Sequence, residues 1–327
     1  MTNRENLAAA MACREGQYVP TWELELHCYD ALSGRRLMLG REFEALSAQQ
    51  QQAAMHANAE IILSVVNRLG LSMVLAPGRY WHVSPGVLAY YVLPSHAVLP
   101  QTAIIRKLAG DDLVLVGNTG GVIGMPGSEQ YLEFSYKLFD DPQEIDQQAR
   151  DTLAAGIENA RKLRDVGVDV AQTASDIADN HGPFFSPEQM DRYILPYIDQ
   201  WATAVHEMGM YAVMHTDGNL MPCLETLAET ELDAIQAIDP TAGMDMKMAK
   251  DAVKGRLCLC GNVDTGLLVS GTPQQIYEAT RKLLETCKAG GGLILGASNA
   301  VYYETPAENY LAMNQAWREH GRFGSTR

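Results

Sequence analysis

The chain has 327 residues, of which 47% are hydrophobic and 20% are charged, and its formal net charge is −15 at pH 7. A chain of this length can bury a large core, and its negative charge argues against binding to nucleic acid or to anionic membrane surfaces. It contains no apolar run of about 18 residues, no signal-peptide core near its start and too few cysteines for a disulfide framework, so we expect a cytoplasmic protein without a nucleic-acid or membrane partner.

Short apolar runs alternate with helical stretches along the chain. The runs that we predict to be strands are 18–26, 71–77, 111–121, 166–176, 210–218, 232–240, 255–264 and 291–300. Helices are predicted over 58–70, 142–166 and 186–209, and the last of these has Ser186 as its N-cap and Pro187 at its first position. Alternation of this kind predicts a parallel sheet with its faces covered by helices.

Eight strand–helix units that close on themselves form a TIM barrel. We therefore expect an α/β protein with a single (β/α)8 TIM-barrel domain over residues 1–327. A doubly wound open sheet is the alternative, but no G-x-G-x-x-G motif opens the first unit. The segment 78–105 does not fit the repeat, and we interpret it as an insertion or hairpin at the barrel mouth, near the second strand.

In a TIM barrel, the catalytic residues lie at the carboxyl ends of the strands and in the loops that follow. Acids, amides, a thiol and an imidazole occupy these positions in seven of the eight predicted units. They are Glu23, Glu25, Asn118, Asp176, His215, Asp217, Asp239, Cys260, Asn262, Asp264, Ser298 and Asn299. The sequence thus predicts a polar site at one end of the barrel.

His215 is the only histidine at a predicted strand end, and Asp217 follows two residues later. A His-x-Asp pair can supply two ligands to one metal ion, or the acid can orient the imidazole. Cys260 ends another predicted strand, and a thiolate near an imidazole is a candidate zinc ligand. The alternatives are a hydrogen-bonded structural histidine and a buried core cysteine. Asp264 has the alternative role of capping the next helix.

Four motifs of the carboxyl-terminal half together resemble the uroporphyrinogen decarboxylase superfamily. They are "DIADNHGPFFSPEQ", "HTDGN", "GNVDTGLLVSGTPQQIYEATRKLL" and "GGGLILGASNAVYYETPAENYLAM". The resemblance covers residues 110–320 well and the first hundred residues only loosely. It implies a TIM barrel. The superfamily includes both porphyrinogen decarboxylases and methyltransferases that move a methyl group to or from a corrinoid protein.

The motifs resemble the methyltransferase branch more than the decarboxylases. The decarboxylases have an Arg-rich "RQAGRY" segment, an Asp after the second strand and a Gly-His-Gly after the last, where this chain has "TWELELHCYD", "LAPG" and "GASNA". The coenzyme M-type methyltransferases bind zinc through His-x-Cys and a later Cys. Here His215 matches the histidine, whereas Asp217 and Ser298 stand where the cysteines would be. The chain is most similar to the enzymes that demethylate methoxylated aromatics or other small methylated compounds.

The resemblance implies O-demethylation, in which the methyl group is transferred to a corrinoid protein. The cofactor of that partner is converted from cob(I)alamin to methylcob(III)alamin. An aryl methyl ether is inert, so a zinc ion or a proton donor must activate its oxygen. The zinc ligands expected are His215, Asp217 and Cys260. The catalytic residues expected are His215, Asp217, Asp176 and Asp239. The substrate-binding residues expected are Glu23, Asn118, Asn180, Ser298 and Asn299.

Further aromatic side chains are expected from the inserted segment, where Tyr80, Trp81, Tyr90 and Tyr91 would line an aryl pocket or meet the corrinoid protein. A decarboxylase or lyase acting on a small acid is an alternative function, and so is a barrel that binds a ligand without turnover. The methyl donor, the identity of the metal and assembly into a homodimer stay open.

Overall fold

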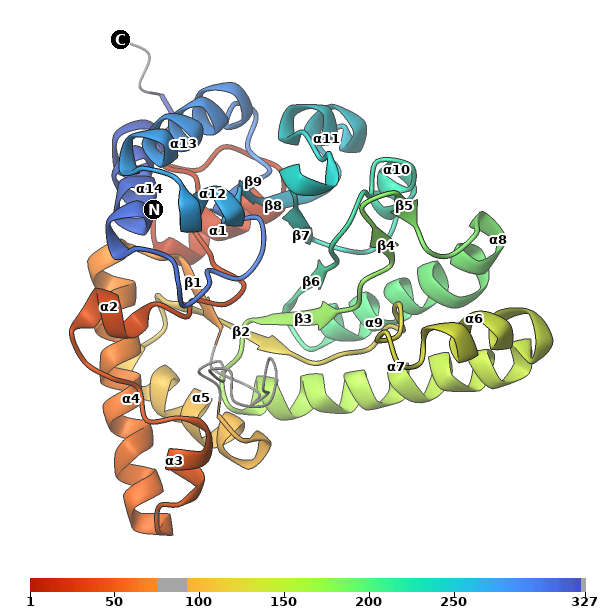
Figure 1. The fold of residues 1–327 in the computed structure, drawn as a ribbon, viewed down its shortest axis with the longest axis horizontal. Coiled ribbons are helices and arrows are strands. Elements are labelled where there is room, and N and C mark those ends of the chain that lie inside the picture. The colour runs from red at the N-terminus through yellow and green to blue at the C-terminus, as the bar shows by residue number, and fades with distance from the viewer. Residues whose placement is uncertain (76–92, 325–327) are drawn as a thin grey trace.

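The computed structural model describes residues 1–75 and 93–324. Its centre is a curled sheet of seven parallel strands in the order β1-β2-β3-β6-β7-β8-β9 (Figure 1). The strands are β1 Met73–Leu75, β2 Val114–Asn118, β3 Val170–Ala174, β6 Tyr211–His215, β7 Ala234–Ile238, β8 Cys258–Val263 and β9 Leu293–Ala297. Seven of the eight predicted strands are therefore confirmed, and each is an apolar run with little exposure to solvent, as a parallel sheet covered by helices requires.

The remaining predicted strand, 18–26, does not form a regular strand. It makes only isolated parallel bridges, from Thr21 to Leu295 and from Leu26 to Val301. The segment nevertheless hydrogen-bonds to both edges of the sheet, because the carbonyl of Thr21 accepts from the amide of Met73 while the amide of Trp22 donates to the carbonyl of Leu295. The expected closed barrel of eight strands is thus replaced by a seven-stranded sheet and an irregular connecting segment.

Local chemistry explains this irregularity. Pro20 has no N–H group and cannot complete a ladder of hydrogen bonds. On the neighbouring strand, a Cβ atom at Gly296 would lie 2.0 Å from the carbonyl oxygen of Trp22, so only glycine allows the two backbones to approach this closely.

Helices surround the outside of the sheet (Figure 1). The helices are α1 Asn3–Met11, α2 Tyr29–Ser33, α3 Gly40–Glu44, α4 Ala48–Leu69, α5 Ser95–Ala109, α6 Tyr131–Asp140, α7 Pro142–Asp165, α8 Pro187–Gln189, α9 Leu195–Glu207, α10 Leu224–Leu227, α11 Met246–Val253, α12 Thr265–Ser270, α13 Pro273–Cys287 and α14 Ala307–His320, with a π-helix at Met190–Ile194 and a 3₁₀ turn at Pro240–Ala242. Ser186 caps α8 as predicted, accepting from the amide of Gln189. Among the helices described, none is long and apolar enough to cross a membrane.

The segment 78–105, which we expected to be an insertion or hairpin, is helical in its second half. Residues 78–92, with the four aromatic side chains predicted there, lie outside the described residues. Residues 95–105 belong to α5, which packs against α4 as the helix of an ordinary strand–helix unit. Ala97, Gln101 and Ile105 recur every four residues and are all buried, which is the spacing of a helix face in contact with a core.

Two separate apolar clusters hold the sheet in place. One lies between the outer face of the sheet and the helices. The other fills the inside of the curl, where side chains from alternate strand positions meet Leu7, Ala10 and Met11 of α1. Helix α1 therefore closes the interior from one end, and the opposite end, where the strands terminate, is left for polar residues.

Candidate active site

His215 is the last residue of β6, and its ring faces the inside of the curled sheet. Val213, two residues earlier, belongs to the interior cluster, so the period of two places both side chains on the same face. His215 pairs in register with Gln236 on β7, and its Nδ1 lies 2.5 Å from Gln236 Oε1. An amide oxygen can only accept, so Nδ1 carries a proton and Nε2 is the ring nitrogen that faces away from Gln236.

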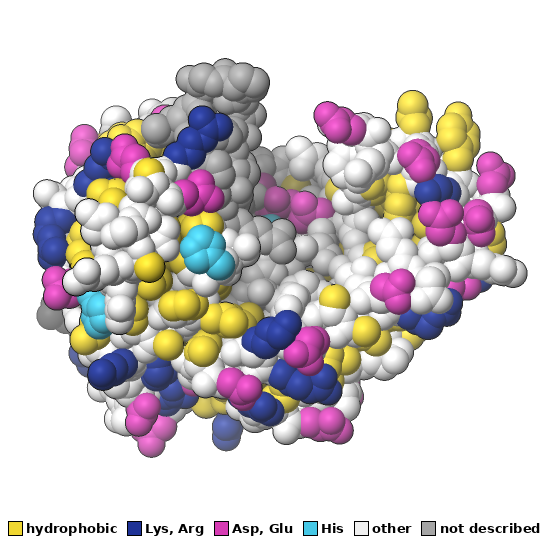
Figure 2. Space-filling model, turned by 90° about the horizontal axis from the view of Figure 1, so that it is seen from below, with side chains coloured by type: hydrophobic (Ala, Val, Ile, Leu, Met, Phe, Trp, Pro, Cys, Tyr) yellow, Lys and Arg dark blue, Asp and Glu magenta, His cyan; other side chains and the backbone are white. Residues whose placement is uncertain are grey.

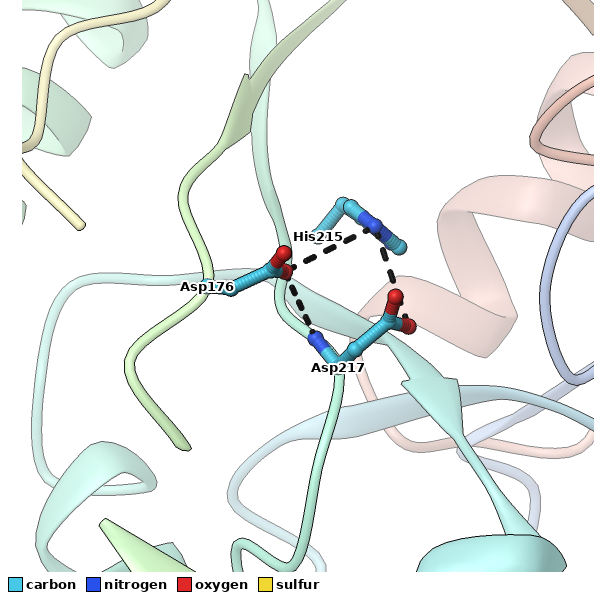
Figure 3. Close-up of side chains that lie close together, drawn as sticks. All are labelled: Asp176, His215 and Asp217. Atoms are coloured by element: carbon cyan, nitrogen blue, oxygen red, sulfur yellow. Dashed lines mark hydrogen bonds and ion pairs between the residues drawn. The ribbon is translucent and has the colours of Figure 1, made fainter. Parts of the chain in front are cut away.

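Two carboxylates lie beside Nε2 (Figure 3). Nε2 lies 3.9 Å from Asp176 Oδ1 and 3.8 Å from Asp217 Oδ1. Asp176 follows β3 and Asp217 follows β6, and the loops are joined where the amide of Asp217 donates to Asp176 Oδ1 at 2.9 Å. The distances from Nε2 are too long for hydrogen bonds, so the three side chains surround a small gap rather than closing it.

Asp217 carries an unsatisfied oxygen into this gap. Its Oδ2 accepts from the side-chain amide of Asn299 at 2.7 Å, while its buried Oδ1 has no hydrogen-bond partner among the described residues. Burial raises the pKa of Asp217 above its ordinary value, and the nearby carboxylate of Asp176 acts in the same direction, whereas His215 and Asn299 act to lower it. A buried oxygen of this kind is costly unless a cation or a proton satisfies it.

The donor set fits a divalent metal ion. The ligand atoms of Asp176, His215 and Asp217 all lie within 4.8 Å of one another. Zinc holds nitrogen and oxygen ligands at about 2.1 Å, which separates two ligands of a tetrahedral ion by about 3.4 Å. The two separations from His215 Nε2 are a few tenths of an ångström larger, a difference that small side-chain rotations can close. His215 also donates through its other nitrogen, as metal-bound histidines usually do.

Cys260 does not join this group, contrary to the ligand set expected from the sequence. It is buried, and with Cys258 it belongs to the apolar cluster inside the curl. Burial raises the pKa of the Cys258 thiol well above its ordinary value, and the neighbouring Cys260 thiol acts in the same direction. Asp176 instead lies beside His215 and Asp217.

A cavity of about 600 Å³ opens beside His215. Its polar lining includes Asn118, Gln172 and Asn299, and much of the remaining wall is apolar, with Leu75, Leu99 and Val116 among the side chains. Figure 2 shows the surface hollowed on this face, with acidic side chains lying inside the hollow. A volume of this size suits a small organic molecule.

The other residues predicted for the site lie elsewhere. Glu23 is buried between β9 and α14, where its carboxyl accepts from the amide of Ala297 and the hydroxyl of Tyr310, both at 2.9 Å. Asn180 is exposed at the turn between β4 (Ala178–Asp179) and β5 (Gly182–Pro183), and it does not line the cavity.

Ser298 and Asp239 also stand apart from the cavity lining. Ser298 is fully buried, and its hydroxyl has no partner among the described residues. Asp239 caps the 3₁₀ turn, accepting from the amide and the hydroxyl of Thr241. It remains close enough to Asp217 to raise the pKa of that acid slightly further.

Two glutamines of the site were not predicted. Gln236 and Gln172 lie inside runs that otherwise read as apolar strands, and both side chains are buried. Gln236 orients His215, and Gln172 lines the cavity. The available signal was a lone amide at an inward position of a strand, because such a group is rarely buried without a partner.

Comparison with known proteins gives the family. The model of the uroporphyrinogen decarboxylase (URO-D) family matches residues 94–320, a stretch that contains Asp176, His215 and Asp217. The chain belongs to this family.

Within the URO-D family, the sequence is similar to enzymes of both branches. It is 31% identical to methylcobamide:CoM methyltransferase MtbA of Methanosarcina acetivorans over 127 residues, which are 38% of this chain and 35% of that protein. It is 22% identical to uroporphyrinogen decarboxylase of Syntrophotalea carbinolica over 224 residues, which are 65% of this chain and 61% of that one. These matches therefore span about a third and about three fifths of the relatives' lengths.

Among solved structures, a methyltransferase from Methanosarcina mazei has a similar fold. The superposition has a TM-score of 0.75, and it covers 98% of this chain and 99% of the other at 20% sequence identity. At this level of identity the likeness shows a common fold over nearly the whole length.

Proposed function

We propose that this protein is a corrinoid-dependent methyltransferase that takes a methyl group from a small methylated donor, a methoxylated aromatic being favoured. Three findings support the proposal: membership of the URO-D family, similarity to a protein named methylcobamide:CoM methyltransferase, and the group formed by Asp176, His215 and Asp217 beside the cavity. The group is the strongest of the three findings, because it holds an unpaired Asp217 oxygen where an activating cation would be bound.

The ligands favour zinc that activates an oxygen leaving group. Asp176, His215 and Asp217 would hold the ion, and a bound zinc would withdraw electron density from the ether oxygen. Carboxylate and imidazole ligands are harder than thiolates and give the metal less electron density. Such a site suits polarisation of an ether oxygen better than activation of a thiol, for which the metal should be electron-rich.

The protein's own residues prepare the reaction. The amide of Gln236 fixes the His215 tautomer, so Nε2 stays available at the mouth. Asn299 holds one oxygen of Asp217 and leaves the other facing Nε2. The apolar cavity wall excludes water and orients the aromatic ring. A corrinoid on the partner would supply cobalt(I) as the methyl acceptor, and the leaving oxygen, held at this site, would keep the bonding electron pair.

The proposed partner is a corrinoid protein. A corrinoid is a large cofactor that must reach the carboxyl ends of the strands on its own carrier, so the encounter is expected to be transient and of modest area. The alternative of a lyase acting on a small acid requires no corrinoid, and the alternative of a binding protein requires no turnover.

Elemental analysis combined with a methyl-transfer assay tests the proposal. The purified protein should contain about one zinc ion per chain, and it should convert cob(I)alamin to methylcob(III)alamin with a methoxylated aromatic, followed by the absorbance change of the corrinoid. Lack of any methyl transfer from a panel of methoxyarenes, methanol and methylamines would contradict the methyltransferase. Transfer by a protein that holds no metal would contradict the zinc and leave proton donation as the activating step.

A further inference from the structure

Gln172 presents an unpaired hydrogen-bonding group to the cavity. It lies on β3 two residues after Val170 of the interior cluster, and it is 1% exposed. Its Oε1 is buried without a partner among the described residues, and the side chain lines the cavity. A buried amide acceptor left unsatisfied costs free energy, so a donor supplied by a ligand would bind here with a gain.

Asn118 stands next to Gln172 and supplies the complementary donor. The two residues pair in register on β2 and β3, and both follow residues of the interior cluster by two positions, so their side chains share one face. Asn118 Oδ1 accepts from the amide of Gly120 at 3.1 Å, and Nδ2 donates to no other group among the described residues. Both side chains line the cavity. Together they form an acceptor and a donor side by side.

The spacing connects this pair to the proposed reaction centre. The sheet order β2-β3-β6 places Asn118 two strands from His215 and Gln172 one strand away. Because Gln172 pairs with Val213, two residues before His215, Asn118 lies about 12 Å from His215 at the usual strand separation and rise per residue. Apolar side chains, among them Leu75 and Val116, line the same cavity. An aromatic ring can therefore span the cavity with its methoxy group towards His215 and another substituent at the amide pair.

We propose that Gln172 and Asn118 form a subsite for a ring hydroxyl, so that the substrate is a methoxyphenol. This inference rests on the proposed function and specifies its substrate. A hydroxyl satisfies both amides, because it donates to Gln172 Oε1 and accepts from Asn118 Nδ2. A ring carboxylate has no proton to donate and would set its charge against the unpaired oxygen. A ring without a polar substituent would leave both amides unpaired.

Binding to the purified protein, without corrinoid, tests the subsite directly. We expect calorimetry to show 2-, 3- or 4-methoxyphenol binding about 10- to 100-fold more tightly than methoxybenzene. 1,4-Dimethoxybenzene, which lacks the donated proton, should bind no better than methoxybenzene. In Gln172→Met the preference for the hydroxyl should fall to about threefold or less, with the affinity for methoxybenzene retained.

Gln101→Met is the matched control. Gln101 is also a buried glutamine whose Oε1 has no partner among the described residues, but it lies on α5 and does not line the cavity. Its substitution should leave the hydroxyl preference intact. Equal binding of methoxyphenols and methoxybenzene by the wild type would overturn the subsite, and so would an unchanged preference in Gln172→Met.

A turnover assay with the same compounds separates this inference from the function on which it rests. Methyl transfer from methoxyarenes without a hydroxyl preference would remove the subsite and keep the methyltransferase. A hydroxyl preference in binding, without transfer to cob(I)alamin from any of the methoxyphenols, would keep the subsite and remove the methyltransferase.

Discussion

The inside of the curled sheet has two levels that differ in chemistry although they use the same strands. At the lower level, side chains such as Val213, Cys258 and Ile294 are fully buried and pack against α1. One step up the same inward face, Val213 gives way to His215 on β6, and Val170 gives way to Gln172 on β3. Buried oxygens without partners occur on the cavity-facing Gln172 and on Asp217, which follows His215.

The residues that stabilise the fold and the residues that form the candidate site therefore lie at different levels of the same strands. The lower level is filled by apolar side chains and is held together by close packing. The upper level is incomplete, and an incomplete polar site is stable only because the packed level below holds the strand ends in place. We therefore expect substitutions at the two levels to separate loss of activity from loss of stability.

The largest effect is expected at His215. His215→Ala should lower methyl transfer by about 10³-fold or more and remove the bound metal, because it deletes the central ligand of the group. Its free energy of unfolding should stay within about 2 kcal/mol of the wild type. Steady-state kinetics, metal analysis and chemical denaturation measure the three quantities.

Val213→Ala provides the comparison on the same strand and face. It should cost about 2 kcal/mol of stability through the lost methyl groups and the cavity left behind. Metal content and turnover should stay close to those of the wild type below its unfolding temperature. A variant His215→Ala that keeps its activity, or a Val213→Ala variant that loses its metal while folded, would abolish the distinction between the levels.

The second effect concerns Glu23, a carboxyl buried away from both levels. Burial raises its pKa from 4.5 to about 8, although hydrogen bonds from Ala297 and Tyr310 act to lower it. Between these values the unfolded chain has released the proton while the folded protein retains it. The free energy of unfolding should therefore fall as the pH rises from about 4.5 to 8, by up to about 4 kcal/mol.

Glu23→Gln tests this linkage, because the amide is uncharged like the protonated carboxyl: its oxygen can accept from Ala297, and its NH2 group can donate to the Tyr310 hydroxyl oxygen. The variant should lose that part of the pH dependence, so its stability relative to the wild type should increase from pH 5 to pH 9 in denaturation experiments. Parallel stability–pH curves for the two proteins would show that Glu23 is ionised in the fold at neutral pH.

A smaller effect is expected at Gln236, which touches His215 and lies outside the ligand group. Gln236→Met should weaken zinc binding by about 10- to 100-fold, because the imidazole loses the acceptor that fixes its tautomer. Gln236→Glu keeps an acceptor and should restore most of the affinity. Competition with a chelator measures both. Equal affinities in Gln236→Met and the wild type would show that the hydrogen bond does not orient the ligand.

The sequence predicts the elements of this protein better than the contacts of its site. Seven strands follow from apolar runs, and His215 stands out because its run ends in polar residues. The pairing of Asp176 with His215 depends on how the loop after β3 meets the loop after β6, where the amide of Ile177 donates to the Thr216 hydroxyl. Neighbours of this kind are more than thirty residues apart, and spacing along the chain carries no signal of them.

The two levels also explain why Cys260, which the sequence predicts to be a metal ligand, lies in the packed interior. A cysteine near the end of a strand can face the mouth or the packed interior, and only the three-dimensional register decides between them. Cys260 pairs with Gln236 of β7 in the sheet, yet its thiol lies among Val213, Cys258 and Ile294 in the interior cluster. Residue type therefore indicated a metal ligand where packing produced a core side chain.

Cys260→Ala is expected to have the smallest effect, and it tests whether Cys260 is a core side chain or a metal ligand. Removal of a buried sulfur should cost about 1–2 kcal/mol of stability, at the low end for a core truncation because few atoms are lost. Zinc stoichiometry and affinity should equal those of the wild type, since in the proposed site Asp176, His215 and Asp217 would hold the ion without a thiolate. Cobalt(II) substitution adds a spectroscopic readout, because a thiolate ligand gives an intense charge-transfer band that an imidazole and two carboxylates do not. Such a band in the wild type, lost in Cys260→Ala together with the metal, would show that Cys260 is a metal ligand. Cys260 would then belong to the upper level.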